Sequence, residues 1–488
     1  MAEHFDVVVV GAGLSGIGAG YHLQTHCPDR SYVILEGRER LGGTWDLFRY
    51  PGIRSDSDMY TLGFSFKPWT NAKAIADGPS ILSYLKETAA EHGIDDHIRY
   101  RTRVTAASWS TEDALWRVTA TENGEERHYT CGFLFMCTGY YNYSRGFAPE
   151  FEGADDFSGR IVHPQFWSDE IDYADKRVIV IGSGATAVTL VPELAKQAAH
   201  VTMLQRSPTY VVSRPSQDAV ANGLRRVLPA KAAYAVTRWK NVLLQQFFYR
   251  LARKRPDKVK AHMVQMVRDQ LGPDYDVERH FTPSYNPWDQ RVCLVPDADL
   301  FATLRSGKAE VVTGHIRRFV QDGIELETGE ILPADLIVTA TGLELQLVSD
   351  IPLIVDGKTV DLSTRTTYKG MMLSDVPNLA LSFGYTNASW TLKADLTSEY
   401  VCRLLKAMRK RGMRQATPRL TTPVEEMPFL DFTSGYVQRA MAKFPRQGTR
   451  KPWRLNQNYS RDLMALRYGS IDTDMEFSNP APRSSPAA

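Results

Sequence analysis

Three glycines near the N-terminus are spaced for contact with a phosphate group. Gly11, Gly13 and Gly16 follow the apolar run VVVV and open a stretch that favours helix. A glycine turn after a buried strand lets a pyrophosphate approach backbone N–H groups, and the helix N-terminus stabilises its charge. Glu36 closes the next apolar run, where an acid can accept hydrogen bonds from ribose hydroxyls. The pattern predicts a dinucleotide site, and a purely structural glycine turn is the alternative.

A second glycine turn follows a second apolar run, RVIVI. Its residues are Gly182, Gly184, Ala185 and Thr186. The next apolar run ends in a glutamine and Arg206 instead of an acid. An arginine there removes repulsion toward a 2′-phosphate and can bind it in a forked geometry, which favours NADP over NAD. The alternative is that Arg206 is a solvated surface charge.

The elements that must position these turns form two βαβ units, one inserted in the other. Residues 5–36 and 177–206 each predict strand, turn, helix and strand. A strand at 376–384 and a long helix from about 391 to 411 are expected to return to the first unit, and the tail from residue 478 onward is expected to be disordered. We therefore expect an α/β fold with two Rossmann-like domains and a helical insert. The expected boundaries are 1–140 with 376–488 for the first domain, 150–215 with 285–375 for the second, and 216–284 for the insert.

Net charge, cysteine spacing and the length of the apolar runs exclude several classes of protein. A net charge of +2 gives no reason to expect a nucleic-acid partner. The five cysteines are scattered without a CxxC pair, which favours a reduced cytoplasmic protein and argues against a disulfide reductase. No metal-ligand set is expected, and no apolar run approaches the roughly 20 residues that cross a bilayer. Two dinucleotides in one chain imply electron flow from NADPH in the second domain to FAD in the first, and the remaining acceptor is O2.

Two longer motifs indicate which flavin chemistry follows. The segment FSGRIVHPQFW contains Phe157, Gly159, His163 and Trp167 in the order FxGxxxHxxxW. Residues 42–56, GGTWDLFRYPGIRSD, fit the pattern GGxWxxxxYPGxxxD. Both resemble motifs of the type I Baeyer–Villiger monooxygenases, relatives of the flavin-containing monooxygenases. The resemblance covers nearly the whole chain and is strongest to the ethionamide-activating subgroup.

The resemblance implies roles for particular residues. The four FxGxxxHxxxW residues would belong to the linker that joins the domains, and for His163 a structural and a chemical role both stay open. Trp390 resembles a position that contacts the nicotinamide cofactor. Further cofactor contacts are expected at Gly43, Thr44, Trp45, Asp56 and Tyr60.

Arg291 is the catalytic residue that the resemblance implies, with Asp56 as its partner. A fixed cation in a dry site stabilises the negative charge of a C4a-peroxyflavin and of its adduct with a ketone. Asp56 would hold the guanidinium in place, and an ordinary salt bridge between domains is the alternative. Many family members have a lysine immediately before this arginine, whereas Gln290 stands here. Which residue performs that lysine's contact with the cofactor stays open.

Residues 225–260 are strongly basic, with eleven Lys and Arg against one Asp, and they contain several aromatic residues. A helical lid over the substrate pocket would have this composition, and we favour that interpretation. A helix on an anionic membrane surface would have it too, so a peripheral membrane contact is the alternative. The oligomeric state stays open.

These observations predict an FAD-, NADPH- and O2-dependent monooxygenase that converts ketones to esters or lactones and also oxidises sulfides. An N- or S-oxygenating flavin-containing monooxygenase is the alternative enzyme. A flavin-binding redox sensor without catalytic function is the alternative from another class.

Overall fold

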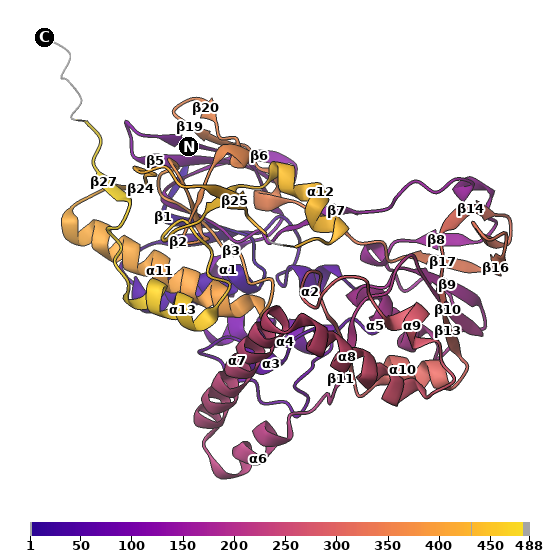
Figure 1. The fold of residues 1–488 in the computed structure, drawn as a ribbon. Coiled ribbons are helices and arrows are strands. Elements are labelled where there is room, and N and C mark those ends of the chain that lie inside the picture. Colours follow the sequence, from indigo (N-terminus) through magenta and orange to yellow (C-terminus); the bar gives the residue numbers. More distant parts are fainter. Residues whose placement is uncertain (1, 431, 482–488) are drawn as a thin grey trace, which may run out of the picture.

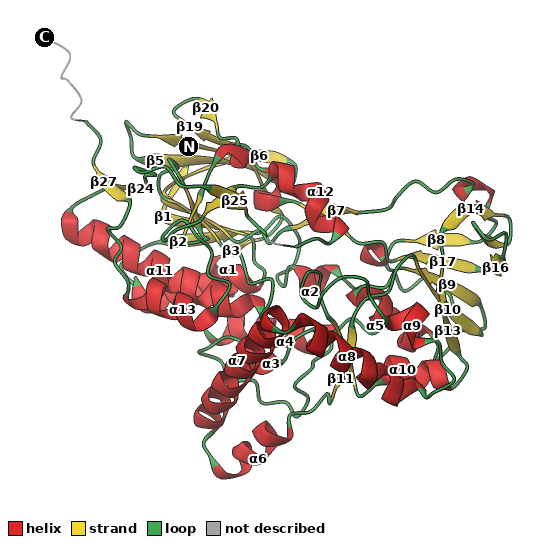
Figure 2. Ribbon diagram, in the orientation of Figure 1, coloured by secondary structure: helices red, strands yellow, loops and turns green. Residues whose placement is uncertain are grey.

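The chain folds around two β-sheets joined by a narrow connection. The computed structural model describes residues 2–430 and 432–481. In Figure 1 the larger sheet and the C-terminal helices lie on the left, and the smaller sheet lies on the right. Helices lie beside both sheets and along the lower edge of the molecule (Figure 2). Most of the tail that was expected to be disordered, residues 482–488, lies outside the described residues.

The first sheet carries the N-terminal glycine turn. Strand β1 (Glu3–Val10) pairs in parallel with β2 (Tyr32–Leu35) and with β6 (Glu125–Met136), and helix α1 (Leu14–His26) connects β1 to β2. The valines of β1 alternate between two separate apolar cores, because both faces of the sheet are covered. The other strands of this sheet are β3 (Ile98–Arg99), β4 (Thr102–Ser110), β5 (Leu115–Glu122), β19 (Leu353–Val355), β20 (Lys358–Thr359) and β23 (Leu379–Leu381).

The C-terminal return of the chain differs from the expected boundary. Strand β23 pairs in parallel with β6, which confirms the return strand predicted at 376–384. However, β19 pairs in parallel with β4, and β20 pairs with β19. Residues 353–359 therefore belong to the first sheet and not to the second unit, where the expected range 285–375 had placed them. The reason is that Leu353 is buried in an apolar core of the first sheet, so the chain crosses back before residue 353.

The second sheet is entirely parallel. Its order is β13, β10, β9, β17, β8, and helix α5 (Ala185–Leu194) connects β9 to β10. Its strands are β8 (Arg160–Val162), β9 (Arg177–Ile181), β10 (His200–Gln205), β13 (Ala309–Thr313) and β17 (Leu336–Thr339). A small antiparallel sheet lies beside it, formed by β14 (Ile316–Val320), β15 (Gly323–Leu326) and β16 (Ile331–Pro333).

The two crossings between the sheets run side by side. Strand β7 (Tyr141–Gly146) leaves the first sheet, and β18 (Leu343–Leu345) comes back toward it. The two strands pair antiparallel, so the connection is a two-stranded ribbon. In Figure 1, β7 lies between the two sheets.

The residues expected to form a helical insert, 216–284, are largely helical. The helices are α6 (Ala219–Val227), α7 (Ala230–Lys254), α8 (Pro256–Leu271) and α9 (Val277–Phe281). They lie between β11 (Val211–Arg214) and β12 (Cys293–Pro296), which pair in parallel. Among the described residues, no helix is both long enough and apolar enough to cross a membrane.

The remaining elements complete the first unit and one edge of the second. The long helix predicted from about 391 to 411 is confirmed as α11 (Trp390–Arg411), and it packs beside α1. The other helices are α2 (Thr44–Leu47), α3 (Met59–Leu62), α4 (Gly78–Glu91), α10 (Asp299–Arg305), α12 (Gly435–Ala440) and α13 (Tyr459–Leu463). The remaining strand pairs are β21 (Thr367–Tyr368) with β22 (Met372–Leu373), β24 (Gln415–Pro418) with β27 (Met475–Ser478), and β25 (Glu426–Pro428) with β26 (Arg446–Gly448).

Candidate active site

Both glycine turns open onto one cavity of about 2170 Å³. Gly11 has φ +101° and Gly182 has φ +136°, values that residues with a Cβ rarely adopt. A Cβ at Gly11 would lie 2.7 Å from the carbonyl oxygen of Cys137, and one at Gly182 would lie 2.4 Å from that of Ala340. The same local packing therefore forms both turns. Each turn exposes the N-terminus of a helix, α1 or α5, to the cavity.

The first turn is held close to its sheet and to a second glycine segment. A Cβ at Gly16 would lie 1.8 Å from the carbonyl oxygen of Gly11, so glycine is required where α1 begins against β1. Gly43 has φ +56°, and a Cβ there would lie 3.0 Å from the Cα of Gly13. Thr44 and Trp45, which follow Gly43 in α2, line the cavity. The backbone is thus open to a close ligand on both sides of this turn.

Glu36 lies at the end of β2 with its carboxylate against the first turn. Its Oε2 accepts a hydrogen bond from the Ala12 N–H at 2.7 Å, and its Oε1 accepts one from the Arg38 N–H at 2.9 Å. Burial raises the pKa of Glu36 above its ordinary value, while these two N–H groups oppose that shift. The side chain lines the cavity, where a ribose hydroxyl could donate a hydrogen bond to it.

The second turn faces basic and neutral groups. Gly184, Ala185 and Thr186 line the cavity at the start of α5. Gln205, the last residue of β10, is buried and donates hydrogen bonds to the His280 carbonyl oxygen at 2.8 Å and to Thr313 Oγ1 at 2.9 Å. Arg206 is exposed and lines the cavity next to it. This end of β10 therefore presents a cation and no carboxylate, as a 2′-phosphate requires.

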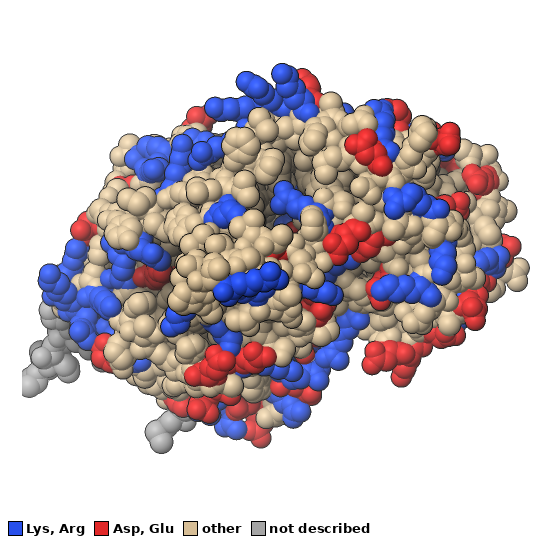
Figure 3. Space-filling view, turned by 90° about the horizontal axis from the view of Figure 1, so that it is seen from below, with Lys and Arg blue, Asp and Glu red and all other residues tan. Residues whose placement is uncertain are grey.

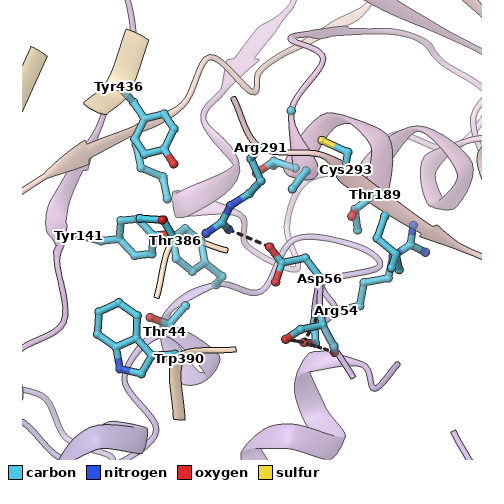
Figure 4. Close-up of a pocket in the computed structure, with 18 of the residues that line it drawn as sticks. Thr44, Arg54, Asp56, Tyr141, Thr189, Arg291, Cys293, Thr386, Trp390 and Tyr436 are labelled. Atoms are coloured by element: carbon cyan, nitrogen blue, oxygen red, sulfur yellow. Dashed lines mark hydrogen bonds and ion pairs between the residues drawn. The ribbon is translucent and has the colours of Figure 1, made fainter. Parts of the chain in front are cut away.

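Arg291 and Asp56 form an ion pair within the cavity. Asp56 comes from the loop between α2 and α3, and Arg291 from the segment directly before β12. The Arg291 Nη1 donates to Asp56 Oδ2 at 2.8 Å (Figure 4). This carboxylate raises the pKa of Arg291 well above its ordinary value. The pair joins the α2–α3 loop to the segment that follows the helical insert. It forms only because folding brings these distant parts of the chain together.

Aromatic residues that sequence reasoning did not identify stand around this cation. Tyr141 and Tyr436 lie on the same side of Arg291 in Figure 4. The Tyr140 and Tyr141 hydroxyl groups are 2.9 Å apart, and burial raises the pKa of both phenols. The YY pair directly after the CTG segment at the end of β6 was the available signal for Tyr140 and Tyr141. For Tyr436, far along the chain, the sequence offered none.

Trp390 begins α11 and contacts the first glycine turn. Its indole Nε1 donates to Ser15 Oγ at 2.8 Å, and its ring stacks on Tyr140 with centroids 5.0 Å apart. Trp390 also lines the cavity. Trp390 therefore lies in the cavity, where its contacts with α1 and with Tyr140 hold its ring.

Tyr60 does not occupy the predicted position. Its side chain is buried in the core of the first unit, with its ring centroid 5.9 Å from that of Tyr234 in α7. It is absent from the described lining of the cavity. The structure gives the expected cofactor contact of Tyr60 no support, because α7 packs against α3 and covers this side of it.

The FxGxxxHxxxW residues surround the edge strand β8, and of the described residues that line the cavity none belongs to this motif. Phe157 and Trp167 are buried in two different apolar cores of the second unit. A Cβ at Gly159 would lie 2.5 Å from the carbonyl oxygen of Asp335. His163 Nε2 lies 3.1 Å from the carbonyl oxygen of Gly342, and Nδ1 accepts a hydrogen bond from the Gln165 N–H at 3.2 Å. The motif thus contacts the two-stranded connection and not the cavity.

Two Rossmann-type turns that open onto one cavity define an α/β protein of the two-dinucleotide class. A family model described as flavin-binding monooxygenase-like matches residues 71–269, and one for an NAD(P)-binding Rossmann-like domain matches residues 9–77. The FAD-containing monooxygenase EthA of Mycobacterium tuberculosis is 56% identical over 486 residues, 99% of each chain. The chain belongs to this family of FAD-containing monooxygenases, which confirms the predicted family.

Other relatives agree with this assignment. The putative FAD-containing monooxygenase MymA of M. tuberculosis is 48% identical over 480 residues, 97% of each chain. The probable FAD-binding monooxygenase AlmA of Acinetobacter baylyi is 47% identical over 476 residues, 97% of this chain and 95% of AlmA.

Solved structures confirm the predicted fold class. An oxidized steroid monooxygenase bound to NADP superposes with a TM-score of 0.78 at 23% identity, over 98% of this chain and 100% of its own. Cyclohexanone monooxygenase bound to ε-caprolactone superposes with a TM-score of 0.76 at 20% identity, over 98% and 100% of the two chains.

Proposed function

We propose that this chain is a Baeyer–Villiger monooxygenase that uses FAD, NADPH and O2 to convert ketones to esters or lactones, and that it also oxygenates sulfides. The observation that carries the proposal is the Arg291–Asp56 ion pair in the cavity that both glycine turns line. Membership in the FAD-containing monooxygenases supports the use of a flavin. The fold shared with cyclohexanone monooxygenase, whose structure holds a lactone, supports the reaction type.

FAD fits the first unit, residues 1–140 together with the chain from β19 onward. The close approach of Gly13 and Gly43 leaves backbone N–H groups open to a pyrophosphate, and the buried Glu36 carboxylate is placed for ribose hydroxyls. The tight turn at Gly11 brings these groups together. We assign Thr44, Trp45 and Asp56 to the same cofactor because they line the adjoining wall of the cavity.

NADPH fits the second unit, which we place at residues 150–215 and 285–342. The N-terminus of α5, with Gly182, Gly184, Ala185 and Thr186, would hold its pyrophosphate. Arg206 would bind the 2′-phosphate, since Gln205 beside it carries no charge and its amide is occupied by neutral partners. Trp390 lies on the first unit's side of the cavity, where it would contact the nicotinamide end.

Bound FAD, once reduced by NADPH, supplies the oxygen-transferring group. Arg291 would stabilise the negative charge that develops at the reacting oxygen atoms, because a cation already fixed by Asp56 needs no reorganisation during reaction. Asp56 would act as its positioning residue, accepting one N–H of the guanidinium and leaving the others free. The high pKa of Arg291 keeps this cation protonated throughout.

The tyrosine pair would shape the remaining wall. Tyr140 and Tyr141 stay neutral at physiological pH because burial raises the pKa of both phenols. They therefore add aromatic surface and hydrogen-bonding hydroxyls beside Arg291 without adding negative charge. An apolar wall of this kind suits the carbon skeleton of a ketone.

Coupled turnover with product identification tests the proposal. The purified holoenzyme, NADPH and O2 are incubated with a linear methyl ketone, cyclohexanone and methyl phenyl sulfide, and the products are identified by mass spectrometry. We expect an ester, a lactone and a sulfoxide, each in proportion to the NADPH consumed. Sulfoxide without any ester or lactone would indicate an N- or S-oxygenase instead. NADPH oxidation that yields only hydrogen peroxide with every substrate would indicate a redox sensor.

We also propose that the enzyme acts in the cytoplasm. All five cysteines are buried as free thiols. Unpaired thiols are typical of a reducing compartment. Fractionation of the source cells, with immunoblotting against this chain, tests the location.

A further inference from the structure

Helix α7 carries a row of exposed apolar side chains. Val236, Trp239, Leu243 and Phe247 recur at helical spacing and are 50%, 43%, 56% and 58% exposed. Single exposed apolar residues are common, but a continuous row of large ones marks an interaction surface. The neighbouring positions Leu244 and Phe248 line the cavity instead, so the exposed row is a separate face of the helix.

The exposure does not come from a loosely attached helix. On its inner face, Arg238 is buried and donates hydrogen bonds to the carbonyl oxygens of Tyr60 and Gly63, each at 2.8 Å. The Tyr234 hydroxyl donates to the Phe64 carbonyl oxygen at 2.9 Å. These contacts fix α7 to the first unit and hold the apolar row outward.

Helix α6 carries a further exposed apolar side chain beside α7. Val227, near the C-terminal end of α6, is 75% exposed and does not line the cavity, whereas Val220 at the start of α6 does line it. Helix α6 packs against α7 and lies at the lower edge of the molecule in Figure 1. The view from below shows uncharged atoms over much of this side of the molecule, with Lys and Arg side chains and some Asp and Glu side chains among them (Figure 3).

The charged side chains of helices α6, α7 and α8 are mostly basic. From residue 219 to residue 271 the chain holds twelve Lys and Arg and two Asp. Arg226, Lys231, Arg250 and Lys254 are exposed and form no ion pair with any described residue. Of these, Arg250 and Lys254 continue the helical spacing of the apolar row toward the C-terminal end of α7. Exposed charges that the protein does not neutralise are available to a negatively charged partner.

We propose that this surface, the α6–α7 face, binds an anionic lipid bilayer. The face is defined as Val227, Val236, Trp239, Leu243 and Phe247 together with Arg226, Lys231, Arg250 and Lys254, none of which lines the cavity. Exposed aromatic and aliphatic side chains enter the headgroup region, and the flanking cations are attracted to anionic lipids. Trp239 suits this boundary because its indole has an apolar body and a polar N–H.

The same charges argue against a second copy of the chain as the partner. A twofold interface places a surface patch against itself, so the four unpaired cations would face one another. Like charges brought together at an interface oppose association. A partner with dense negative charge and an apolar interior can bind both the basic and the apolar residues of the face.

Flotation of the purified holoenzyme with vesicles tests the proposal. The vesicles are neutral phosphatidylcholine, or phosphatidylcholine with about one third phosphatidylglycerol. We expect at least about tenfold more protein bound to the anionic vesicles at low salt, with binding lost as salt screens the charges. Two variants test the two parts of the face separately. L243S/F247S removes apolar side chains, and R250E/K254E reverses basic ones. Each is expected to lower binding at least about tenfold, since membrane affinity depends on both apolar and basic side chains.

Matched variants elsewhere serve as controls. Ile331→Ser removes a 50% exposed apolar residue from β16, and K308E/K358E reverses two exposed lysines, one next to β13 and one in β20. Both are expected to bind like the original chain. None of the four substituted α7 residues lines the cavity, so NADPH oxidation without vesicles should be unchanged in all variants and reports correct folding.

Several outcomes would overturn the proposal. These are equal binding to neutral vesicles, no binding to any vesicle, and binding that both α7 variants retain. An oligomer that L243S/F247S converts to monomers, without vesicle binding, would identify the face as a contact between copies of the chain.

Discussion

His163 contacts both strands of the connection between the two units. Its Nδ1 accepts a hydrogen bond from the Gln165 N–H, so Nε2 carries the proton and donates to the Gly342 carbonyl oxygen at 3.1 Å. On the other strand, a Cβ at Gly146 would lie 2.0 Å from His163 Cε1. The histidine ring therefore occupies the space that a side chain at Gly146 would need. Of the two roles left open for His163, its position supports the structural one.

Gly146→Ala is expected to destabilise the protein by about 1 to 3 kcal/mol, the usual cost of overpacking a well-packed site. The added methyl group would meet the His163 ring, which its two hydrogen bonds hold in place. Thermal unfolding followed by circular dichroism measures the change in Tm. Gly223→Ala is the control: it lies in α6, a Cβ there meets nothing within 4 Å, and it should leave Tm unchanged or slightly raised.

The double variant G146A/H163A separates a clash from a backbone effect. If the clash is the cause, removal of the ring should recover most of the stability lost by Gly146→Ala, and the two effects will not add. Additive losses would show that His163 and Gly146 act independently, which contradicts the packing argument.

Stability is expected to fall between about pH 7.5 and pH 5.5, and His163→Gln should reduce the fall. Burial lowers the pKa of His163 below its ordinary value of 6.5. The unfolded chain therefore binds a proton more readily than the folded chain, and stability is lost as the pH falls through the unfolded pKa. Burial also lowers the pKa of His26 and His280, so they add to the same slope.

Urea unfolding midpoints at several pH values measure this dependence. His163→Gln and His280→Gln should each remove part of the slope, and the two together should remove more. A slope that is the same in the original chain and in the double variant would show that these histidines do not cause it.

The parts of the fold that could be predicted from the sequence depend on local patterns. The turns at Gly11 and Gly182 follow apolar runs, and their local geometry requires glycine. The helix at 390–411 and the strand at 379–381 also have clear local patterns. The motif around β8 was recognisable from its residue types and their spacing, although its contacts with Asp335 and Gly342 involve parts of the chain far along the sequence.

The parts that could not be predicted depend on long-range packing. Strands β19 and β20 are short and carry no pattern that distinguishes one sheet from the other, so their pairing with β4 was missed. Tyr60 follows the glycine-rich motif in sequence, but α7, from far along the chain, covers it. Tyr436 reaches Arg291 only through the return of the C-terminal segment.

Arg291→Ala is expected to lower product formation by about 100- to 1,000-fold, the usual loss when one group that stabilises a developing negative charge is removed. NADPH oxidation should continue, because Arg206 and the second glycine turn are untouched. The measurement is product formed per NADPH consumed. Asp56→Asn should cost less, roughly ten- to a hundredfold, since it weakens a hydrogen bond to a charged group but leaves the cation.

Arg177→Ala is the matched control for this ion pair. Arg177 pairs with Asp335 at 2.6 Å where the adjacent strands β9 and β17 begin, and neither residue lines the cavity. Product formed per NADPH should be unchanged in this variant. Arg291→Ala with half or more of the original product yield would contradict the role given to the cation.

Arg206→Gln is expected to raise the KM for NADPH roughly ten- to a hundredfold, because a hydrogen bond between charged groups is lost. The KM for NADH should change by less than about twofold, since NADH has no 2′-phosphate for the guanidinium to bind. Steady-state kinetics with both cofactors measures the difference, and Lys308→Gln, an exposed residue next to β13, should leave both values unchanged. An equal rise for the two cofactors would mean that Arg206 contacts a part that they share. In that case no group at this end of β10 would select NADP, because the Gln205 amide already donates its hydrogen bonds to the His280 carbonyl oxygen and to Thr313 Oγ1.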